Sequence, residues 1–350
     1  MLSGCGLYDK EYVKISDYSA PLSEGLQDDR ISNSSQLRTC ILNLVYNGEK
    51  EGKAVFSDEY EGDVANDLSL IISQVKRQDA LCAYCVESID YSLSHIVSYD
   101  EAGLSITYSD TGVSVDKVVQ IPYAIGFDRY ILNSFSDCSR KLVLLINRTA
   151  YSATDMKDKI EDIYCSNPGF CPCTPDISVS LFSGNSNQKL YEIEFDYGMD
   201  QSEIVKKRAE MKSVCVSYYE DDDDYARIDK ISTYLTNSCE YSPDSGHSSI
   251  YDALVMNNAD SEGIALAVVE LCDRAGIESC IVHGQKNRVD CCWNIVKVGT
   301  DYFHVDIPAC ILYGKDAGFL KSDTFMWNAY RWDTSAYPAC SVNSEIDVNG

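Results

Sequence analysis

The sequence has few basic residues and no long apolar run. Lysine and arginine together number 29, against 55 aspartates and glutamates, so the formal net charge is −26. A charge of this sign and size opposes binding to nucleic acids and electrostatic docking on anionic lipids. No run of about eighteen apolar residues occurs, so no transmembrane helix is predicted. With 350 residues, the chain is long enough for two or three globular domains.

Cysteine, in contrast, is abundant, with sixteen residues. In a reducing compartment so many thiols would need metals or redox chemistry to explain them, whereas in an oxidising compartment they form disulfides. Cys82 and Cys85 have zinc-like spacing, and Cys171 and Cys173 form a second close pair, but only His95 follows the first. These pairs do not make up a zinc ribbon. We therefore expect an exported protein with disulfides and with no metal or cofactor.

The first residues favour attachment to a bacterial membrane through lipid. Leu2-Ser-Gly-Cys5 is similar to the lipobox of bacterial lipoproteins, in which small residues precede the cysteine that is lipidated after signal cleavage. The polar stretch from Asp9 to Ser35 lacks apolar periodicity, as expected of a tether. We expect residues 1–35 to form this tether, with Cys5 as the lipid anchor on the extracellular face of the membrane and the signal peptide outside this chain. A chance Gly-Cys pair is the alternative.

A weak internal repeat runs through the first two thirds of the chain. Cys40-Ile-Leu-Asn43 recurs 90 residues later as Tyr130-Ile-Leu-Asn133. Each copy is followed by a β-rich run, an apolar stripe at helical spacing, and two segments that alternate apolar and polar residues as antiparallel strands do. We predict two small tandem α+β units, at residues 36–118 and 119–200, followed by a third domain at residues 201–350.

The third domain has a buried helix followed by strands. Apolar residues recur at helical spacing from Ser261 to Ala275, and Gly276 is placed to end this helix. Short connections favour an antiparallel sheet for the strands predicted after it, at residues 278–284, 291–298 and 301–306. The acidic run at residues 220–224 precedes another predicted helix, so we expect it to cap that helix. It lacks the glycine and terminal glutamate of a calcium loop.

Three motifs follow one another in this domain: Ser261-Glu-Gly263, Cys291-Cys-Trp-Asn294 and Val305-Asp306. In this order they resemble the motifs of the bacterial transglutaminase-like superfamily, which has a papain-like core. Family members read Cys-Glu-Gly-Tyr at the start of the core helix, His-Ala-Trp-Asn on the next strand and Val-Asp on the following one. The resemblance extends over residues 223–335 and implies an α+β domain whose core helix packs on an antiparallel sheet.

Two of the family's catalytic positions are replaced in this sequence. The nucleophilic cysteine corresponds to Ser261 and the histidine base to Cys291, while the aspartate is retained as Asp306. A serine hydroxyl needs a strong base, and a thiol beside a carboxylate has a raised pKa and cannot carry a positive charge. The resemblance therefore implies a degenerate triad. It also predicts further residues of the cleft: Glu262, Trp293 and Asn294.

Other residues are weighed as substitutes for the missing groups. His247, His283 and His304 are candidate bases, although only geometry can place them. Cys291 or Cys292 is a candidate relocated nucleophile, against the alternative that adjacent cysteines are disulfide partners or buried thiols.

Together, the lipobox-like residues and the resemblance predict a cell-surface protein that is catalytically impaired and acts as a binding or structural module. Its expected partner is a protein or peptide, with a cell-wall component as a further choice. One alternative is an active peptide or amide hydrolase, or an acyltransferase, with a rearranged triad. Another is an adhesion or scaffold protein whose acidic repeats carry the function.

Overall fold

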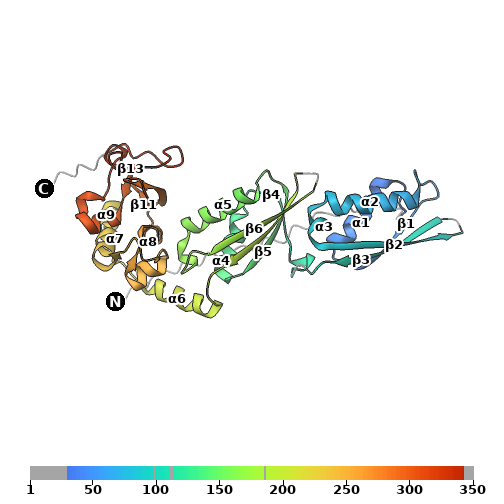
Figure 1. Ribbon diagram of the computed structural model, residues 1–350, viewed down its shortest axis with the longest axis horizontal. Helices are drawn as coiled ribbons and strands as arrows, with labels where there is room; N and C mark the ends of the chain where they lie inside the picture. Colours follow the sequence, from blue (N-terminus) through green and yellow to red (C-terminus); the bar gives the residue numbers. More distant parts are fainter. Residues whose placement is uncertain (1–29, 98, 111–112, 185–186, 343–350) are drawn as a thin grey trace.

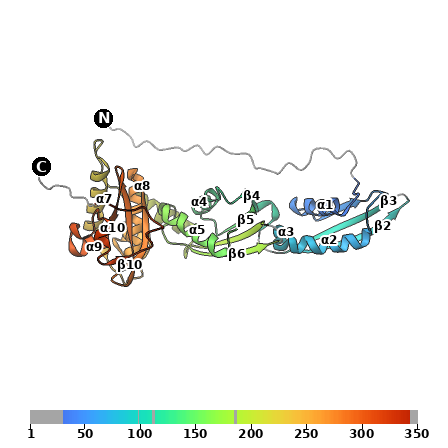
Figure 2. The ribbon, with the colours of Figure 1, turned by 90° about the horizontal axis from the view of Figure 1, so that it is seen from above.

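The computed structural model describes residues 30–97, 99–110, 113–184 and 187–342. The predicted anchor Cys5 and most of the predicted tether lie outside these ranges. The described chain is elongated, with two small α+β units and a larger C-terminal domain in a row (Figures 1 and 2). Within the described residues, no helix combines the length and apolar character needed to cross a bilayer.

The first unit is a three-stranded antiparallel sheet covered by two helices. Its strands have the order β1-β3-β2, and buried apolar residues of α1 and α2, such as Ile41 and Leu68, pack with strand residues such as Leu104. In chain order its elements are α1 (Ser34–Tyr46), β1 (Glu51–Val55), α2 (Val64–Gln78), α3 (Ala80–Cys85), β2 (Val86–Ile96) and β3 (Tyr99–Tyr108).

The second unit repeats this plan. Its sheet has the order β4-β5-β7-β6, and β5-β7-β6 corresponds to β1-β3-β2 of the first unit. Ile41 and Ile131, the matching residues of the sequence repeat, are both fully buried on the first helix of their unit. The added strand β4 lies parallel to β5 at the sheet edge, and the sequence analysis missed it. The elements are η1 (Val115–Lys117), β4 (Val119–Tyr123), α4 (Asp128–Asp137), β5 (Lys141–Arg148), α5 (Ala153–Ser166), η2 (Pro168–Phe170), β6 (Asp176–Ser183) and β7 (Lys189–Asp196).

The first unit packs on the sheet of the second through α3. The Tyr84 hydroxyl donates to Glu192 at 2.6 Å, and the Ala80 amide donates to Gln188 at 3.2 Å. Val143 and Leu145 of β5 belong to the hydrophobic cluster of the first unit. The second sheet is therefore buried on both faces, which accounts for the nearly continuous apolar run of β5.

The third domain has the predicted core helix on an antiparallel sheet, which confirms the α+β fold. The sheet order is β12-β11-β10-β13, and α8 packs on β10 and β11. The elements are α6 (Gln201–Ser213), α7 (Asp224–Ser238), β8 (Glu240–Tyr241), the π-helix η3 (Asp252–Met256), β9 (Asn258–Ala259), α8 (Ser261–Ala275), β10 (Ser279–Lys286), β11 (Val289–Val298), β12 (Asp301–Val305), α9 (Ile307–Tyr313), η4 (Lys315–Ala317), α10 (Asp323–Met326) and β13 (Tyr330–Arg331).

Local signals set the ends of the helices in this domain. Asp260 is the N-cap of α8, and Gly276 ends it with a left-handed φ of 73°, a conformation that favours glycine. Asp223 of the acidic run caps α7 by accepting from the Ala226 amide at 2.8 Å, and Asp222 pairs with Lys230. The acidic run thus acts as the predicted cap.

The second unit and the third domain share one hydrophobic core. A single cluster includes Tyr164 of α5 and Tyr191 of β7 together with Leu266 and Val268 of α8. This shared core fixes α5 beside α8 and β10 of the third domain, near the predicted site.

The described cysteines form no disulfides, in contrast to the sequence prediction. All fifteen of them are free thiols. Cys291 and Cys292 are neighbours on the extended strand β11, so their side chains point to opposite faces and cannot pair. Cys82 and Cys85 lie on the same short helix and are buried. Most of these thiols therefore behave as small apolar core residues.

Candidate functional site

Two of the three predicted triad positions, Ser261 and Cys291, line a cavity of about 560 Å³ at the N-terminus of α8. Ser261 and Glu262 line it from the helix, and Cys291 and Cys292 line it from β11. Lys286 of β10 closes one side. The cavity is the candidate site because Ser261 and Cys291, at the nucleophile and base positions that the motifs predict, both line it.

Ser261 is the first residue of α8, and its hydroxyl is engaged by the backbone. Ser261 Oγ accepts a hydrogen bond from the Cys292 amide at 3.1 Å. The preceding Asp260 caps the helix by accepting from the amides of Glu262 and Gly263 and from the Ser248 hydroxyl. No imidazole of the described residues hydrogen-bonds to Ser261, and such a contact is how a histidine base would activate the hydroxyl.

Cys291 occupies the base position as a protonated thiol. Burial, and next the Asp306 carboxylate, raise the pKa of Cys291 to about 11, although the Lys286 ammonium acts in the opposite direction. A thiol of this pKa is neutral at physiological pH. It can neither take a proton from Ser261 efficiently nor hold a positive charge.

Asp306 is retained, but other groups occupy its oxygens. It is the N-cap of α9, where Oδ1 accepts from the Ala309 amide at 2.8 Å. Oδ2 lies 3.2 Å from the Lys286 ammonium and also accepts from the Tyr330 hydroxyl. Only 3% of Asp306 is exposed, so the Lys286 ion pair is what neutralises its buried charge. Lys286 is thus the cation that pairs with Asp306 in this chain.

A second thiol and imidazole meet on the neighbouring strands. Cys292 Sγ lies 3.3 Å from His283 Nδ1, because His283 and Cys292 are register partners in β10 and β11. Burial, and next the nearby Glu262, raise the pKa of Cys292 to about 12. Burial also lowers the pKa of His283, although Asp162 and Glu161 of α5 act in the opposite direction. The pair is therefore a neutral thiol beside a neutral imidazole.

The other two candidate histidines are engaged elsewhere. His304 is fully buried, its Nδ1 accepts from the Trp293 indole at 2.9 Å, and its Nε2 lies 2.8 Å from Asp323. His247 Nδ1 lies 3.6 Å from an oxygen of Asp252. The sequence analysis could not place either residue, because both positions depend on tertiary packing.

His304, Asp323 and Cys340 come together as possible metal ligands, with their ligand atoms within 4.8 Å of one another. The indole N–H of Trp293 donates to His304 Nδ1, so neutral His304 carries its proton on Nε2 and donates it to Asp323. A metal at Nε2 would require a proton on Nδ1, facing the indole N–H. The hydrogen bonds therefore oppose a metal here, and the group holds the C-terminal segment in place.

Two of the predicted cleft residues lie behind the cavity. Trp293 packs with Met326 and Tyr330 in a separate cluster and is not among the residues that line the cavity. Asn294 faces the core helix and donates to the Ala265 carbonyl at 3.0 Å. Side chains alternate along β11, so Trp293 and Asn294 point to opposite faces of the sheet. Glu262 does line the cavity.

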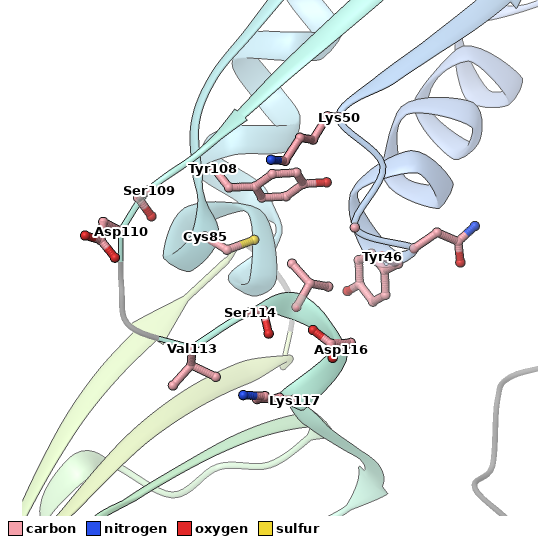
Figure 3. Close-up of a pocket in the computed structure, with 13 residues that line it drawn as sticks. Tyr46, Lys50, Cys85, Tyr108, Ser109, Asp110, Val113, Ser114, Asp116 and Lys117 are labelled. Carbon is pink, nitrogen blue, oxygen red and sulfur yellow. The ribbon is translucent and has the colours of Figure 1, made fainter.

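A larger cavity, of about 670 Å³, lies at the junction of the two α+β units (Figure 3). Side chains from α1, β3 and η1 line it, among them Tyr46, Tyr108 and Lys117. Burial raises the pKa of Cys85 there to about 12. The described lining residues include no imidazole, so the larger cavity offers no nucleophile and base pair.

A family model matches part of the third domain. Residues 215–307 match the model of the transglutaminase-like superfamily, so this part of the third domain is transglutaminase-like. The matched range includes Ser261, Cys291 and Asp306.

Two solved structures are also similar. One is a Cytophaga hutchinsonii protein with a provisional cysteine-protease assignment, at 13% identity and a TM-score of 0.26, covering 38% of this chain and 64% of that one. The chain thus spans less than two thirds of that protein. The other is a TGase, at 9% identity and a TM-score of 0.27, covering 73% of this chain and 78% of that one. A search of curated proteins gives no match.

Proposed function

We propose that this is a cell-surface transglutaminase-like protein whose catalytic site is impaired and whose third domain acts as a binding or structural module. The observation that carries the proposal is the state of Asp306. Its oxygens are held by Lys286, by the Tyr330 hydroxyl and by the Ala309 amide, and no histidine stands between this carboxylate and Ser261.

The electrostatics of the cavity support impairment. A cysteine-type mechanism needs a thiol of low pKa beside a base that can become cationic. In this cavity burial and nearby carboxylates raise the pKa of both Cys291 and Cys292. The first residue of the helix, which the dipole would favour as an anion, is a hydroxyl instead. Neither requirement is met by the groups present.

The location and partner belong to the same proposal. Lipid attachment through Cys5 would hold the elongated body on the extracellular face of a bacterial membrane. The partner would be a protein or peptide, or a cell-wall component, bound by the third domain. Support for this comes from the lipobox-like residues and the polar stretch that follows them.

One observation favours a second candidate function, an active amide hydrolase or acyltransferase with a rearranged site. Cys292 Sγ and His283 Nδ1 are 3.3 Å apart at the cavity, within reach for proton transfer. In this arrangement Cys292 would be the nucleophile and His283 the base. The raised thiol pKa opposes it, because few thiolates would be present at neutral pH.

Labelling with an electrophilic peptide at neutral pH separates the two candidates. The assay uses a Cys215→Ser background, because Cys215 is the exposed thiol among the described cysteines. For an impaired site we expect no faster labelling than with a small unselective alkylating reagent, and no preferred position. Rapid, stoichiometric labelling of Cys292 that is lost in His283→Ala would reject impairment and establish the rearranged site.

A further inference from the structure

Within the described residues, strand β2 has a partner strand on one side only. In the order β1-β3-β2 it lies at the edge of the first sheet, and its 11 residues make it the longest strand of the described chain. It contains no lysine and no proline, the residues that often keep an edge strand from pairing with another chain. A register shift between Val86 and Ser88 leaves the rest of β2 regular. The edge is thus open to a further strand.

The hydrogen bonds of β3 show which backbone groups of β2 point outward. Toward β1, the Ile106 amide donates and the Asp100 carbonyl accepts. Hydrogen bonds to the two neighbouring strands alternate along a central strand, so the even-numbered residues of β3 bond to β1 and the odd-numbered ones to β2. Beyond the shift, odd-numbered residues of β3 lie opposite even-numbered residues of β2. The odd-numbered residues of β2, from Ile89 to His95, therefore direct their amides and carbonyls outward.

The side chains of these odd-numbered residues lie on the face that α2 covers, and they become more exposed along the strand. Ile89 is 7% exposed, Tyr91 37% and Leu93 41%. The Tyr91 hydroxyl lies 2.8 Å from the Ser69 hydroxyl of α2, which identifies the face. The cover that α2 provides is therefore incomplete toward the end of β2. A strand added at this edge would bury Tyr91 and Leu93 as well as pair the outward backbone groups.

We propose that this edge pairs with the same edge of a second copy of the chain, antiparallel and about a two-fold axis at Tyr91. Ile89 of each copy then lies opposite Leu93 of the other, and the two Tyr91 side chains adjoin at the axis. Apolar and aromatic cross-strand pairs of this kind stabilise a sheet. An axis at Ser92 would instead set Ile89 opposite His95, whose side chain is 75% exposed. The apolar pattern therefore selects the axis at Tyr91.

The rest of the chain allows this arrangement. On the other face of the sheet, Ser88 lies opposite Ser94 and Asp90 opposite Ser92, so no two carboxylates are directly opposed. Strand β2 runs roughly along the long axis of the molecule (Figure 1). Antiparallel pairing would therefore place the second unit and third domain of the two copies at opposite ends. The surface lies in the first unit, so this inference goes beyond the role proposed for the third domain.

Charge distinguishes a second copy from a basic peptide at the same edge. A net charge of −26 opposes association of two copies at low ionic strength, but salt screens exposed charges beyond about 8 Å at physiological ionic strength. We therefore expect dimerisation to strengthen with added salt. A basic peptide would bind more weakly with added salt, and β2 offers it only Asp90 among three serines on the other face.

The test is the oligomeric state of the full chain, measured by sedimentation velocity at rising protein concentration and at about 50 and about 300 mM NaCl. We expect reversible monomer–dimer exchange that is tighter at the higher salt concentration. Leu93→Lys places an ammonium against Ile89 of the other copy, twice in each dimer, and should raise the dissociation constant at least about tenfold. Ser92→Asp opposes Asp90 across the axis and repeats the test if Leu93→Lys does not fold.

The matched control is Leu312→Lys, which changes a leucine of α9 that is 53% exposed and should leave the dimer unchanged. For the register, Asp90→Cys and Ser92→Cys chains, both in the Cys215→Ser background, are mixed with oxidised glutathione. The Cα atoms of such a non-hydrogen-bonded pair lie about 4.5 Å apart, which is within disulfide reach. The mixture should form a cross-linked dimer, and neither chain alone should.

The proposal is overturned if the chain stays monomeric, if both edge variants dimerise like the native chain, or if Leu312→Lys dissociates the dimer equally. It is also overturned if Ser92→Cys cross-links alone, which would move the axis, or if the dimer weakens with salt. Binding of oligolysine at the edge in place of self-association would assign the edge to a basic partner instead. Electrophile labelling of the cavity in the third domain is independent of all these outcomes.

Discussion

Replacing Ser261 by cysteine together with Cys291 by histidine tests whether the residues at these two positions account for the expected lack of thiolate reactivity in the cavity. Ser261 begins α8, so the helix dipole favours a thiolate there. An imidazole at position 291 would lie in the same cavity and could become cationic. We expect the double variant to gain thiolate reactivity and each single variant to gain little, because groups that act as a unit are not additive.

The size of the gain follows from the pKa values. The pKa of Cys291 is about 11, so on the order of one such thiol in ten thousand is ionised at pH 7. A helix N-terminus and a neighbouring imidazolium lower a thiol pKa to about 7 or less, where about half is ionised. A less basic thiolate is also less nucleophilic, with a Brønsted slope of about 0.4–0.5. The net expected gain in labelling rate is therefore on the order of a hundredfold.

Lys286 limits this gain. Its ammonium lies 3.2 Å from Asp306 and forms an ion pair with it. This carboxylate is the group that would otherwise accept a hydrogen bond from the new imidazole and orient it. Adding Lys286→Met frees the carboxylate, so the triple variant should exceed the double variant. Tyr330 still donates to Asp306 and keeps part of its buried charge satisfied.

The assay is the rate of electrophilic peptide labelling from about pH 5 to pH 9, with the labelled position read by mass spectrometry. In the double variant the rate should rise with an apparent pKa near or below 7. The native protein should react only on the alkaline side. A folded double variant that labels no faster than Ser261→Cys alone would refute the electrostatic account of impairment.

Three further predictions concern stability and thiol access. His304→Phe leaves the Trp293 indole N–H unpaired and should lower the free energy of unfolding by about 2–3 kcal/mol in urea titrations, whereas the exposed His95→Phe should change it by less than about 1 kcal/mol. Burial lowers the pKa of His304, so the folded state favours the neutral imidazole. The contribution of His304 to folding stability is therefore complete above about pH 6.5 and is lost as the pH falls below that value. In His304→Phe the free energy of unfolding should fall less steeply with decreasing pH below about pH 6.5. Asp260→Ala removes the α8 cap and should cost about 1–2 kcal/mol by the same measurement. Under native conditions a thiol reagent should modify Cys215 first, because it is the exposed thiol among the described cysteines. Denaturation should make the other described thiols reactive. A number of reactive thiols in denatured protein well below the number of cysteines would reveal disulfides instead.

Local patterns in the sequence determined much of the third domain. The bounds of α8 follow from an apolar stripe, a capping aspartate and a terminal glycine, all within the helix or next to it. The triad positions follow from motif order along the chain, and Ser261 and Cys291 do line one cavity. The shared strand order of the two units follows from a repeated helix and strand pattern. The helix bounds depend on interactions between residues that are near in sequence, and the other two features were predicted from the order of patterns along the chain.

Tertiary structure decided which groups face one another. The pairing of β10 with β11 places His283 opposite Cys292, and a shift of register by one residue would turn these side chains to the other face. The pairing of β13 with β10 sets Tyr330 opposite Lys286, and both groups reach Asp306. The alignment of motifs carries no information on these contacts, because they join segments distant in the chain. The sequence therefore indicated that two positions of the triad were replaced. Only the packing of the strands showed that Lys286 and Tyr330 both bind the Asp306 carboxylate.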